Sequence, residues 1–483
     1  MSNSAHPQAD NLDPENWDAL RQQAHQMLDD MFDYLQNIRS RPVWQPIPAE
    51  IRAEFQQPLP QQAGDLASAH DTFMRAVVPY AVGNAHPGFM GWVHGGGSPV
   101  GMLADMLAAG LNANVGGREQ MPVEVERQVL RWVRELFGFP DTASGLFVTG
   151  TSMATLIAVL VARHAALGGE VRQHGVAASG TRLTAYTSQA AHGCIAKMMD
   201  IAGLGSDALR LIPVDARYQM DLNALQNSLA ADRALGYTPF FIAGTAGTVN
   251  TGAIDPLNDL ANLAQQQGVW FHVDGAYGAL AMLSPELAPR LAGLERADSV
   301  AFDFHKWGQV PYDAGFVLIR DGAQHLATFS SPAAYLRRDT HGMAGGSPWP
   351  CDFGPDLSRG FHALKTWFTL QVYGTEKLGQ VISHTCELAR YLASRIEQLP
   401  QLELLAPVSL NIVCFRFRSN EADTLNAALI VALQESGIAA PSATTLDGKL
   451  AIRAAIVNHR TNKGDIDALI DATLSIGAAK LRT

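Results

Sequence analysis

Between residues 99 and 365, short runs rich in β-branched and aromatic residues alternate with stretches of helical periodicity. The β-rich runs lie at 145–148, 183–187, 240–243, 269–273, 299–302 and 315–319. Helical stretches lie between several of them, at 154–167 and 255–267. Strands that alternate with helices predict an α/β fold with a mainly parallel sheet covered on both faces. Ligands of such sheets bind beyond the carboxyl ends of the strands, so the residues that follow each run are the candidates for a functional site.

The segments on both sides of this region are predicted to form separate units. Residues 1–98 predict an N-terminal helical arm for dimerisation, in which Asp13 caps a helix with Pro14 at its first position. The proline-rich stretch after this helix either wraps a partner subunit or forms a surface linker. Residues 366–483 contain a long helical pattern, two strand-like runs and a final helix, which predict a smaller C-terminal α/β domain. The large domain is therefore expected at residues 99–365.

The overall charge and the cysteines restrict the partners and the compartment. The formal net charge of -11 argues against a nucleic acid or an anionic membrane as the main partner. The four cysteines are scattered and form no C-x-x-C pair, so a disulfide scaffold is not expected. The polar start of the chain lacks the apolar stretch of a signal peptide, and no apolar run approaches the length of a membrane span. These features predict a cytoplasmic protein.

A stretch of small and hydroxyl residues follows the first β-rich run. Thr151 and Ser152 stand where this run gives way to a helical pattern. Hydroxyls and backbone N–H groups at a helix N-terminus can bind an anion such as a phosphate. The alternative is that one of the two hydroxyls caps the helix. Neither a G-x-G-x-x-G nor a P-loop pattern is present to decide between them.

An aspartate and a lysine follow two later runs. Asp274 ends a run that should be buried, and a buried carboxylate needs a cation or hydrogen bonds. A protonated pyridine nitrogen is such a partner, although a turn cap is an alternative. Lys306 follows the next run and, if buried, could form an imine with an aldehyde; on average a lysine is a solvated surface charge. A phosphate site, an acid and a lysine follow one another along the chain, each at a strand end, and this order favours the functional interpretation.

A histidine completes the set of candidates. His192 follows the run at 183–187, where its imidazole could stack on a planar cofactor, or could be an ordinary loop histidine. A metal site is not expected, because no H-E-x-x-H or paired Cys/His spacing occurs. A serine hydrolase is not expected either, because there is no G-x-S-x-G elbow.

Taken together, these residues resemble the group II pyridoxal-phosphate decarboxylases, which include aromatic-amino-acid, glutamate and cysteine-sulfinate decarboxylases. The resemblance covers nearly the whole chain. It rests on His86-Pro87-Gly88-Phe89, Ala191-His192-Gly193, His272-Val273-Asp274-Gly275-Ala276-Tyr277, His305-Lys306-Trp307 and Leu450-Ala451-Ile452-Arg453. It implies the type I aminotransferase-like fold with a seven-stranded type of sheet, pyridoxal 5'-phosphate as cofactor, and an obligate homodimer with shared active sites.

The resemblance also implies roles for individual residues. Lys306 is the expected Schiff-base lysine, and Asp274 is expected to hold the pyridinium nitrogen. The expected ring contacts are Ala276 on one face and His192 on the other. Further cofactor contacts are expected from Thr151, Ser152, Thr248 and His305, and Arg453 matches an arginine that grips the substrate near its α-carboxylate. Tyr335 matches a mobile-loop tyrosine that protonates the substrate carbon after carbon dioxide leaves; the alternative is an ordinary surface loop.

Several residues depart from the family pattern. Asp303 stands where many relatives have asparagine, and it is expected to face away from the phosphate, because a second anion there is unfavourable. Trp92 replaces a pocket-shaping residue and favours an aromatic substrate, whereas Asn114 and Gly116 resemble the stretch that reaches the partner's site. The expected reaction is decarboxylation of an L-amino acid to the amine. The alternatives are an acidic or other small substrate, an oxidative deaminase or aldehyde synthase, and a catalytically silent binding subunit.

Overall fold

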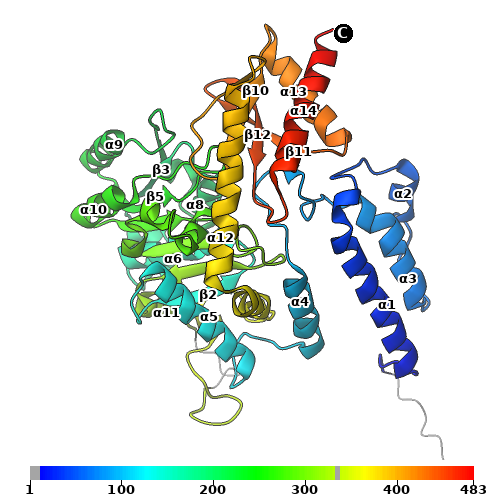
Figure 1. The fold of residues 1–483 in the computed structure, drawn as a ribbon. Helices are drawn as coiled ribbons and strands as arrows, with labels where there is room; N and C mark the ends of the chain where they lie inside the picture. Colours follow the sequence, from blue (N-terminus) through cyan, green and yellow to red (C-terminus); the bar gives the residue numbers. More distant parts are fainter. Residues whose placement is uncertain (1–10, 332–337, 483) are drawn as a thin grey trace, which may run out of the picture.

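The computed structural model describes residues 11–331 and 338–482, and its centre is a seven-stranded sheet (Figure 1). The strand order is β2-β8-β7-β6-β5-β3-β4. The strands are β2 (Ser144–Val148), β3 (Leu183–Ser188), β4 (Leu209–Ile212), β5 (Thr238–Thr245), β6 (Trp270–Asp274), β7 (Ser299–Asp303) and β8 (Gly315–Ile319). Only β8 runs antiparallel to its neighbours, so the predicted mainly parallel sheet is confirmed. Strand β4 was not predicted.

Helices cover both faces of this sheet because successive strand residues point to opposite sides. Val300 and Phe302 of β7 pack in the same core cluster as residues of α5 (Met121–Phe137) and α10 (Leu257–Gln267). Ala301, between them, packs instead with α6 (Thr151–Leu167). The remaining helices of this part are α4 (Pro99–Leu111), α7 (Val171–His174), α8 (Cys194–Ile201), α9 (Leu222–Ala234) and α11 (Gly322–Phe329). The observed layers are those expected from the sequence.

The C-terminal part contains a second sheet of five strands, in the order β1-β11-β12-β10-β9. Its strands are β1 (Phe89–Met90), β9 (Leu402–Leu404), β10 (Ile412–Phe417), β11 (Ala440–Leu446) and β12 (Lys449–Ala455). Helices α12 (Ala363–Glu397), α13 (Ala422–Glu435) and α14 (Lys463–Lys480) share a core with it. Strand β1 comes from the predicted arm, so the arm segment contributes to the C-terminal sheet. The three domain limits stay predictions.

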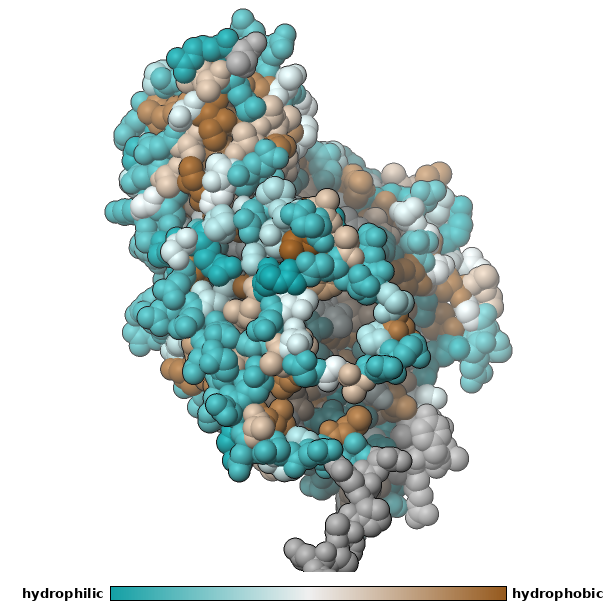
Figure 2. All heavy atoms as spheres, turned by 90° about the vertical axis from the view of Figure 1, so that its right-hand side faces the viewer, coloured by the Kyte–Doolittle hydropathy of each residue, from teal (hydrophilic) through white to brown (hydrophobic). Residues whose placement is uncertain are grey.

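The N-terminal helices lie beside the rest of the molecule, in blue in Figure 1. They are α1 (Trp17–Gln36), α2 (Ala49–Glu54) and α3 (Leu66–Thr72). The expected cap at Asp13 is wrong, because the side chain of Asn16 accepts hydrogen bonds from the N–H groups of Asp18 and Ala19 and starts α1 there. No residue of α1 is buried in the single chain. Figure 2, which faces this side, shows hydrophobic patches separated by hydrophilic side chains.

Within residues 11–331 and 338–482, no helix combines the length and the apolar composition needed to cross a bilayer.

Candidate active site

A cavity of about 400 Å³ lies at the carboxyl ends of β5, β6 and β7, next to the start of α6. The end residues of these strands are Thr245, Asp274 and Asp303, and all three line it. This is the edge at which a parallel α/β sheet binds its ligands. Of the predicted site residues, the structure places Lys306, Asp274, Ala276, His192, Thr151, Ser152, His305 and Trp92 in the lining.

Lys306 reaches the cavity from the turn after β7. Its Nζ atom lies 2.8 Å from Oδ2 of Asp303, and its side chain is 22% exposed. Asp303 is itself buried, at 2% exposure, and lines the cavity together with Lys306. The expectation that Asp303 faces away is therefore wrong: the ammonium of Lys306 supplies the cation that this buried carboxylate needs.

Asp274 lies at the end of β6, the strand that pairs with β7. It is 1% exposed, and its Oδ1 atom accepts a hydrogen bond of 3.1 Å from the backbone N–H of Ala276. Burial raises the pKa of the Asp274 carboxyl above its ordinary value, against the opposing field of Lys306. A carboxyl group in this environment favours a cationic partner, such as a protonated ring nitrogen.

The start of α6 forms the third side of the cavity. The cap residue is Gly150, and no side chain caps the helix, so the alternative that Thr151 or Ser152 caps it is wrong. The hydroxyl of Thr151 is buried and has no hydrogen-bond partner among the described residues. A helix N-terminus with free N–H groups and an unpartnered hydroxyl can hold a phosphate group. A buried hydroxyl with no partner is otherwise unfavourable, which supports a ligand at this position.

Two histidines flank these groups. The Nδ1 atom of His192 accepts a hydrogen bond of 3.2 Å from the backbone N–H of Cys194, which orients the ring at the cavity. The ring of His305 packs against that of Tyr312, with the centroids 4.2 Å apart and the planes tilted by 36°, and its Nδ1 atom accepts a hydrogen bond from the N–H of Ala314. Burial lowers the pKa of His305 to about 4, so this ring is neutral near pH 7.

Aromatic rings form the outer wall of the cavity. Trp92 is 53% exposed, and its ring stacks on His94 with the centroids 5.8 Å apart. His94 in turn stacks on Phe89 at 5.7 Å and meets Tyr312 edge-on at 6.0 Å. Trp92, His94 and Tyr312 line the cavity and offer ring surface to a ligand at its mouth, and the buried ring of Phe89 supports His94 from behind.

Other predicted residues lie outside this lining. The hydroxyl of Thr248 forms hydrogen bonds within its own loop: it bonds to the hydroxyl of Thr251 and accepts from the N–H of Ala253. Arg453 lies behind the wall, where it donates to the carbonyls of Trp92 and Val249.

The two residues expected at a partner's site are also engaged within the chain. The Oδ1 atom of Asn114 accepts from the N–H groups of Gly116 and Arg359. A side chain at Gly116 would collide with the carbonyl of Leu357. Tyr335 lies outside the described residues.

Reasoning from the sequence missed several lining residues. Thr245 stands three positions before the predicted Thr248, and its buried hydroxyl has no partner among the described residues. The signal was present, because Thr245 ends a β-rich run as Asp274 does. His94 and Tyr312 also line the cavity, but they lie in irregular segments where no periodicity marks them.

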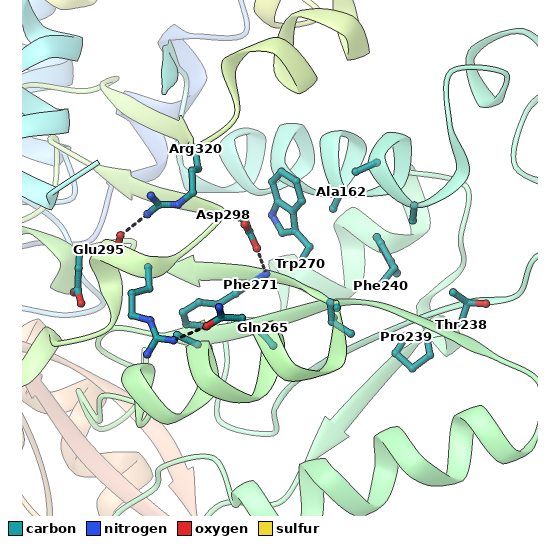
Figure 3. Close-up of a pocket in the computed structure, with 17 residues that line it drawn as sticks. Ala162, Thr238, Pro239, Phe240, Gln265, Trp270, Phe271, Glu295, Asp298 and Arg320 are labelled. Atoms are coloured by element: carbon teal, nitrogen blue, oxygen red, sulfur yellow. Dashed lines mark hydrogen bonds between the residues drawn. The ribbon is translucent and has the colours of Figure 1, made fainter. Parts of the chain in front are cut away.

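A larger cavity, of about 770 Å³, lies at the opposite ends of the strands (Figure 3). Its lining includes Thr238 and Trp270, the first residues of β5 and β6. Its charged side chains already bond to the protein: Asp298 accepts from the N–H of Phe271, and Arg320 donates to the carbonyl of Glu295. The cavity at the carboxyl ends, with its unpartnered hydroxyls and its lysine, is the candidate active site.

The donor set of that cavity fits pyridoxal phosphate. A lysine, a buried carboxylate and an open helix N-terminus can take its aldehyde, its ring nitrogen and its phosphate, respectively. Fold and site together thus define a pyridoxal-phosphate enzyme of the type I fold. The family model described as pyridoxal-dependent decarboxylase conserved domain matches residues 48–418. The chain belongs to this family and is a pyridoxal-phosphate-dependent amino-acid decarboxylase.

Similar proteins agree with this assignment. The chain is 33% identical to an aromatic-L-amino-acid decarboxylase of Bacillus atrophaeus, over 92% of each chain. It is 32% identical to an L-2,4-diaminobutyrate decarboxylase of Rhizobium meliloti (strain 1021), over 86% of this chain and 83% of the relative. The crystal structure of Oryza sativa TDC with PLP and tryptamine has the same fold, with a TM-score of 0.89, 24% identity, and coverage of 97% of this chain and 100% of that one.

Proposed function

We propose that the enzyme converts an L-aromatic amino acid to the corresponding amine and carbon dioxide. The observation that carries this proposal is the aromatic wall of Trp92, His94 and Tyr312 at the mouth of the cavity, with Phe89 buried behind His94. Flat apolar rings favour a planar aromatic side chain through stacking. A substrate with a second ammonium group would instead need an anionic partner. The carboxylates in the described lining are Asp274 and Asp303, which lie at the cofactor side.

In this proposal, different residues of the cavity hold different parts of the cofactor. Bound pyridoxal phosphate supplies an electron-poor ring that accepts the electron pair of the bond broken to the carboxylate. In the proposal, Lys306 holds the aldehyde carbon and Asp274 keeps the ring nitrogen protonated. His192 and Ala276 enclose the ring between them, and Thr151, with Ser152, holds the phosphate.

Other residues orient the substrate and move a proton. Arg453 fixes the backbone of Trp92, and so acts on the substrate through the wall rather than by direct contact. Tyr335 is proposed to donate a proton to the α-carbon after carbon dioxide has left, which leads to the amine rather than an aldehyde.

A second copy of the chain is proposed to complete the site. Helix α1 buries none of its residues within the chain, and the arm exposes Trp17 (58%), Phe55 (60%) and Phe73 (42%). Exposed apolar side chains on several neighbouring helices favour an interface. In this homodimer, the segment of Asn114 and Gly116 would face the partner's cavity. Light scattering should give twice the mass of one chain, whereas an active monomer at assay concentration would exclude the dimer.

We also propose a cytoplasmic location. The four cysteines are free, and three of them are buried. Unpaired thiols are typical of a reducing compartment. Fractionation of the producing cells should find the protein with the soluble cytoplasmic marker enzymes.

The substrate proposal is tested by a screen of all common L-amino acids. Carbon dioxide, amine, aldehyde and ammonia are measured together with the purified holoenzyme. We expect aromatic amino acids to give amine in equal amount to carbon dioxide. Replacement Trp92→Leu should raise KM for them by about 2- to 10-fold, because an aromatic pair contributes about 0.5–1.5 kcal/mol beyond burial of its area. Preferred turnover of 2,4-diaminobutyrate or glutamate, or no turnover of any amino acid, would refute the proposal.

A further inference from the structure

Asp303 has a feature that the ion pair with Lys306 does not explain. Its Oδ2 atom contacts the ammonium at 2.8 Å, but its Oδ1 atom has no hydrogen-bond partner among the described residues. The side chain is 2% exposed, so water does not satisfy the free oxygen as it would at the surface. A buried acceptor left without a donor costs about 1–3 kcal/mol. A ligand that brings a donor to Oδ1 would therefore be favoured.

The free oxygen lies at the start of α6. A methyl group built on Gly150, the cap residue of this helix, would lie 3.8 Å from Oδ1. The next residue, Thr151, carries the other unpartnered buried oxygen of this corner. The corner therefore holds one acceptor without a donor and one hydroxyl without a partner. It is the corner in which the proposed function places the cofactor's phosphate.

The charges around Asp303 leave this corner poor in cations. Burial lowers the pKa of His305 to about 4, and burial together with Lys306 lowers that of His94, so both rings are neutral near pH 7. Burial raises the pKa of Tyr312 and of the Cys194 thiol to about 12, so both remain protonated. Burial also raises the pKa of Tyr277, so this phenol stays protonated. The remaining titratable groups that line the cavity are Asp274, His192 and Lys306. Within the described lining, Lys306 is the one lysine or arginine, and Asp303 already holds it.

We propose that this pocket binds the phosphate group as its monoanion, which donates its single O–H to Oδ1 of Asp303. A dianion in the same corner would place two unprotonated acceptors side by side at low dielectric, which is strongly unfavourable. The monoanion removes one charge and supplies the missing donor. The proposal rests on the phosphate position given under the proposed function.

Proton uptake follows from this arrangement. A free phosphate monoester loses its second proton with a pKa of about 6, so the ligand in solution is mostly a dianion above that pH. Binding then takes up one proton, and the affinity falls about tenfold for each pH unit above about 6. In Asp303→Asn, the amide offers N–H donors to a dianion. That variant should bind without proton uptake, and its affinity should not depend on pH over this range.

Phosphorus NMR of the holoenzyme tests the proposal, because the phosphorus shift separates a monoanion from a dianion. We expect the bound phosphate to stay at the monoanion position between about pH 6 and 9, well above the free pKa of about 6. Asp303→Asn should move it to the dianion position. Asp274→Asn makes the same change at the ring end of the cavity, and should leave the signal at the parental position. A dianion signal in the parent enzyme would overturn the proposal. A monoanion signal that stays unchanged in Asp303→Asn would also overturn it.

Calorimetry gives a second measurement that does not depend on catalysis. The probe is 4'-deoxypyridoxine 5'-phosphate, which has no aldehyde and so leaves the Lys306 ammonium in place. Titration of the cofactor-free enzyme in buffers of different ionisation enthalpy should show uptake of about one proton, and of none in Asp303→Asn. Equal uptake by both proteins would refute the role of Asp303. Failure of the probe to bind at all would instead contradict the proposed cofactor site.

Discussion

Arg453 holds the backbone of Trp92 in place from the opposite side of the cavity wall. Its Nη1 atom donates to the carbonyl of Trp92 at 3.2 Å and to Oγ of Ser442 at 3.1 Å, and its Nε atom donates to the carbonyl of Val249 at 2.8 Å. The side chain is 3% exposed. One guanidinium on β12 of the C-terminal sheet thus connects two loops that line the active site.

The first prediction concerns this connection. In Arg453→Lys, one ammonium cannot span three acceptors, and hydrogen bonds from a charged group contribute about 1.5–3 kcal/mol each. We expect KM to rise at least tenfold with a smaller change in kcat, since the wall shifts while the cofactor stays bound. Arg416→Lys on the adjacent strand β10, where the arginine pairs with Glu403, is the control and should leave KM unchanged. A fall in kcat without any rise in KM would contradict a positioning role for Arg453.

The second prediction identifies the lysine that holds the cofactor. The purified enzyme should be yellow, and borohydride should remove the absorbance and fix the cofactor to the protein. Peptide mapping should then find the adduct on Lys306, the lysine in the described lining of the cavity. Lys365 is a useful comparison, because it is buried but already bonds to Asp105 and to the carbonyl of Tyr312. An adduct on Lys365 or on any other lysine would show the assignment to be wrong.

A third prediction addresses Asp274. In Asp274→Asn, the amide cannot hold a proton on the ring nitrogen by charge, and loss of a charge-assisted hydrogen bond costs about 1.5–3 kcal/mol. We expect kcat to fall roughly 10- to 100-fold at saturating cofactor. Asp298→Asn makes the same change in the cavity of Figure 3 and should keep parental turnover. Near-normal kcat in the Asp274 variant would remove this residue from the mechanism.

Tyr335 provides the fourth prediction. Tyr335→Phe keeps the ring and removes the proton donor, and a general acid contributes on the order of 10²–10⁴-fold. The variant should bind cofactor and substrate, form amine slowly, and release aldehyde and ammonia when oxygen is present. Amine and aldehyde measured in the same reaction show whether Tyr335 is the proton donor. Amine formation at the parental rate, without aldehyde, would mean that another group supplies the proton.

The fifth prediction is a pH dependence of stability. His325 is fully buried, its Nδ1 atom lies 2.8 Å from Oγ of Ser144, and burial lowers its pKa to about 3. Because the folded-state pKa lies below the ordinary value of about 6.5, the unfolded chain binds more protons between these values. Stability is therefore lost as the pH falls below about 6.5, by about 2 kcal/mol at pH 5 for this one group.

Urea unfolding of His325→Leu tests that dependence. The variant loses the hydrogen bond to Ser144, but it should lose less stability than the parent between about pH 7.5 and pH 5. His384→Leu is the control, because the side chain of His384 is 49% exposed. If the two variants and the parent lose the same stability on acidification, His325 does not contribute to acid sensitivity.

The sequence predicted the layers of the fold well because burial leaves periodic signals. Strands β6 and β7 are apolar runs that end at Asp274 and Asp303, and both runs were located correctly. Strand β4 (Leu209–Ile212) was missed because it lies at the sheet edge and is only partly buried, so its pattern is weak. The start of α1 was misplaced because Asp13 and Asn16 both suit a cap, and only the backbone shows which is used.

The candidate site was predicted in part, for a related reason. Residues at strand ends, such as Lys306 and Asp274, follow from the alternation of strands and helices. The direction of a side chain does not, and Asp303 was expected to point away from the cavity that it lines. The contact between Arg453 and Trp92 joins residues 361 positions apart, and no local pattern indicates such a pairing.

The parallel pairing of β1 with β11 sets the order in which the chain can fold during synthesis. Phe89 lies beside Ala440, so this short strand has no neighbour until most of the chain has left the ribosome. Trp92 lies two residues after this strand, and its hydrogen bond with Arg453 can form only after Arg453 has been synthesised. Chains grow from the N-terminus at about 5–20 residues per second, so the seven-stranded sheet is complete well before the C-terminal sheet can form. A nascent chain could therefore acquire its cofactor pocket before it has a wall to select a substrate.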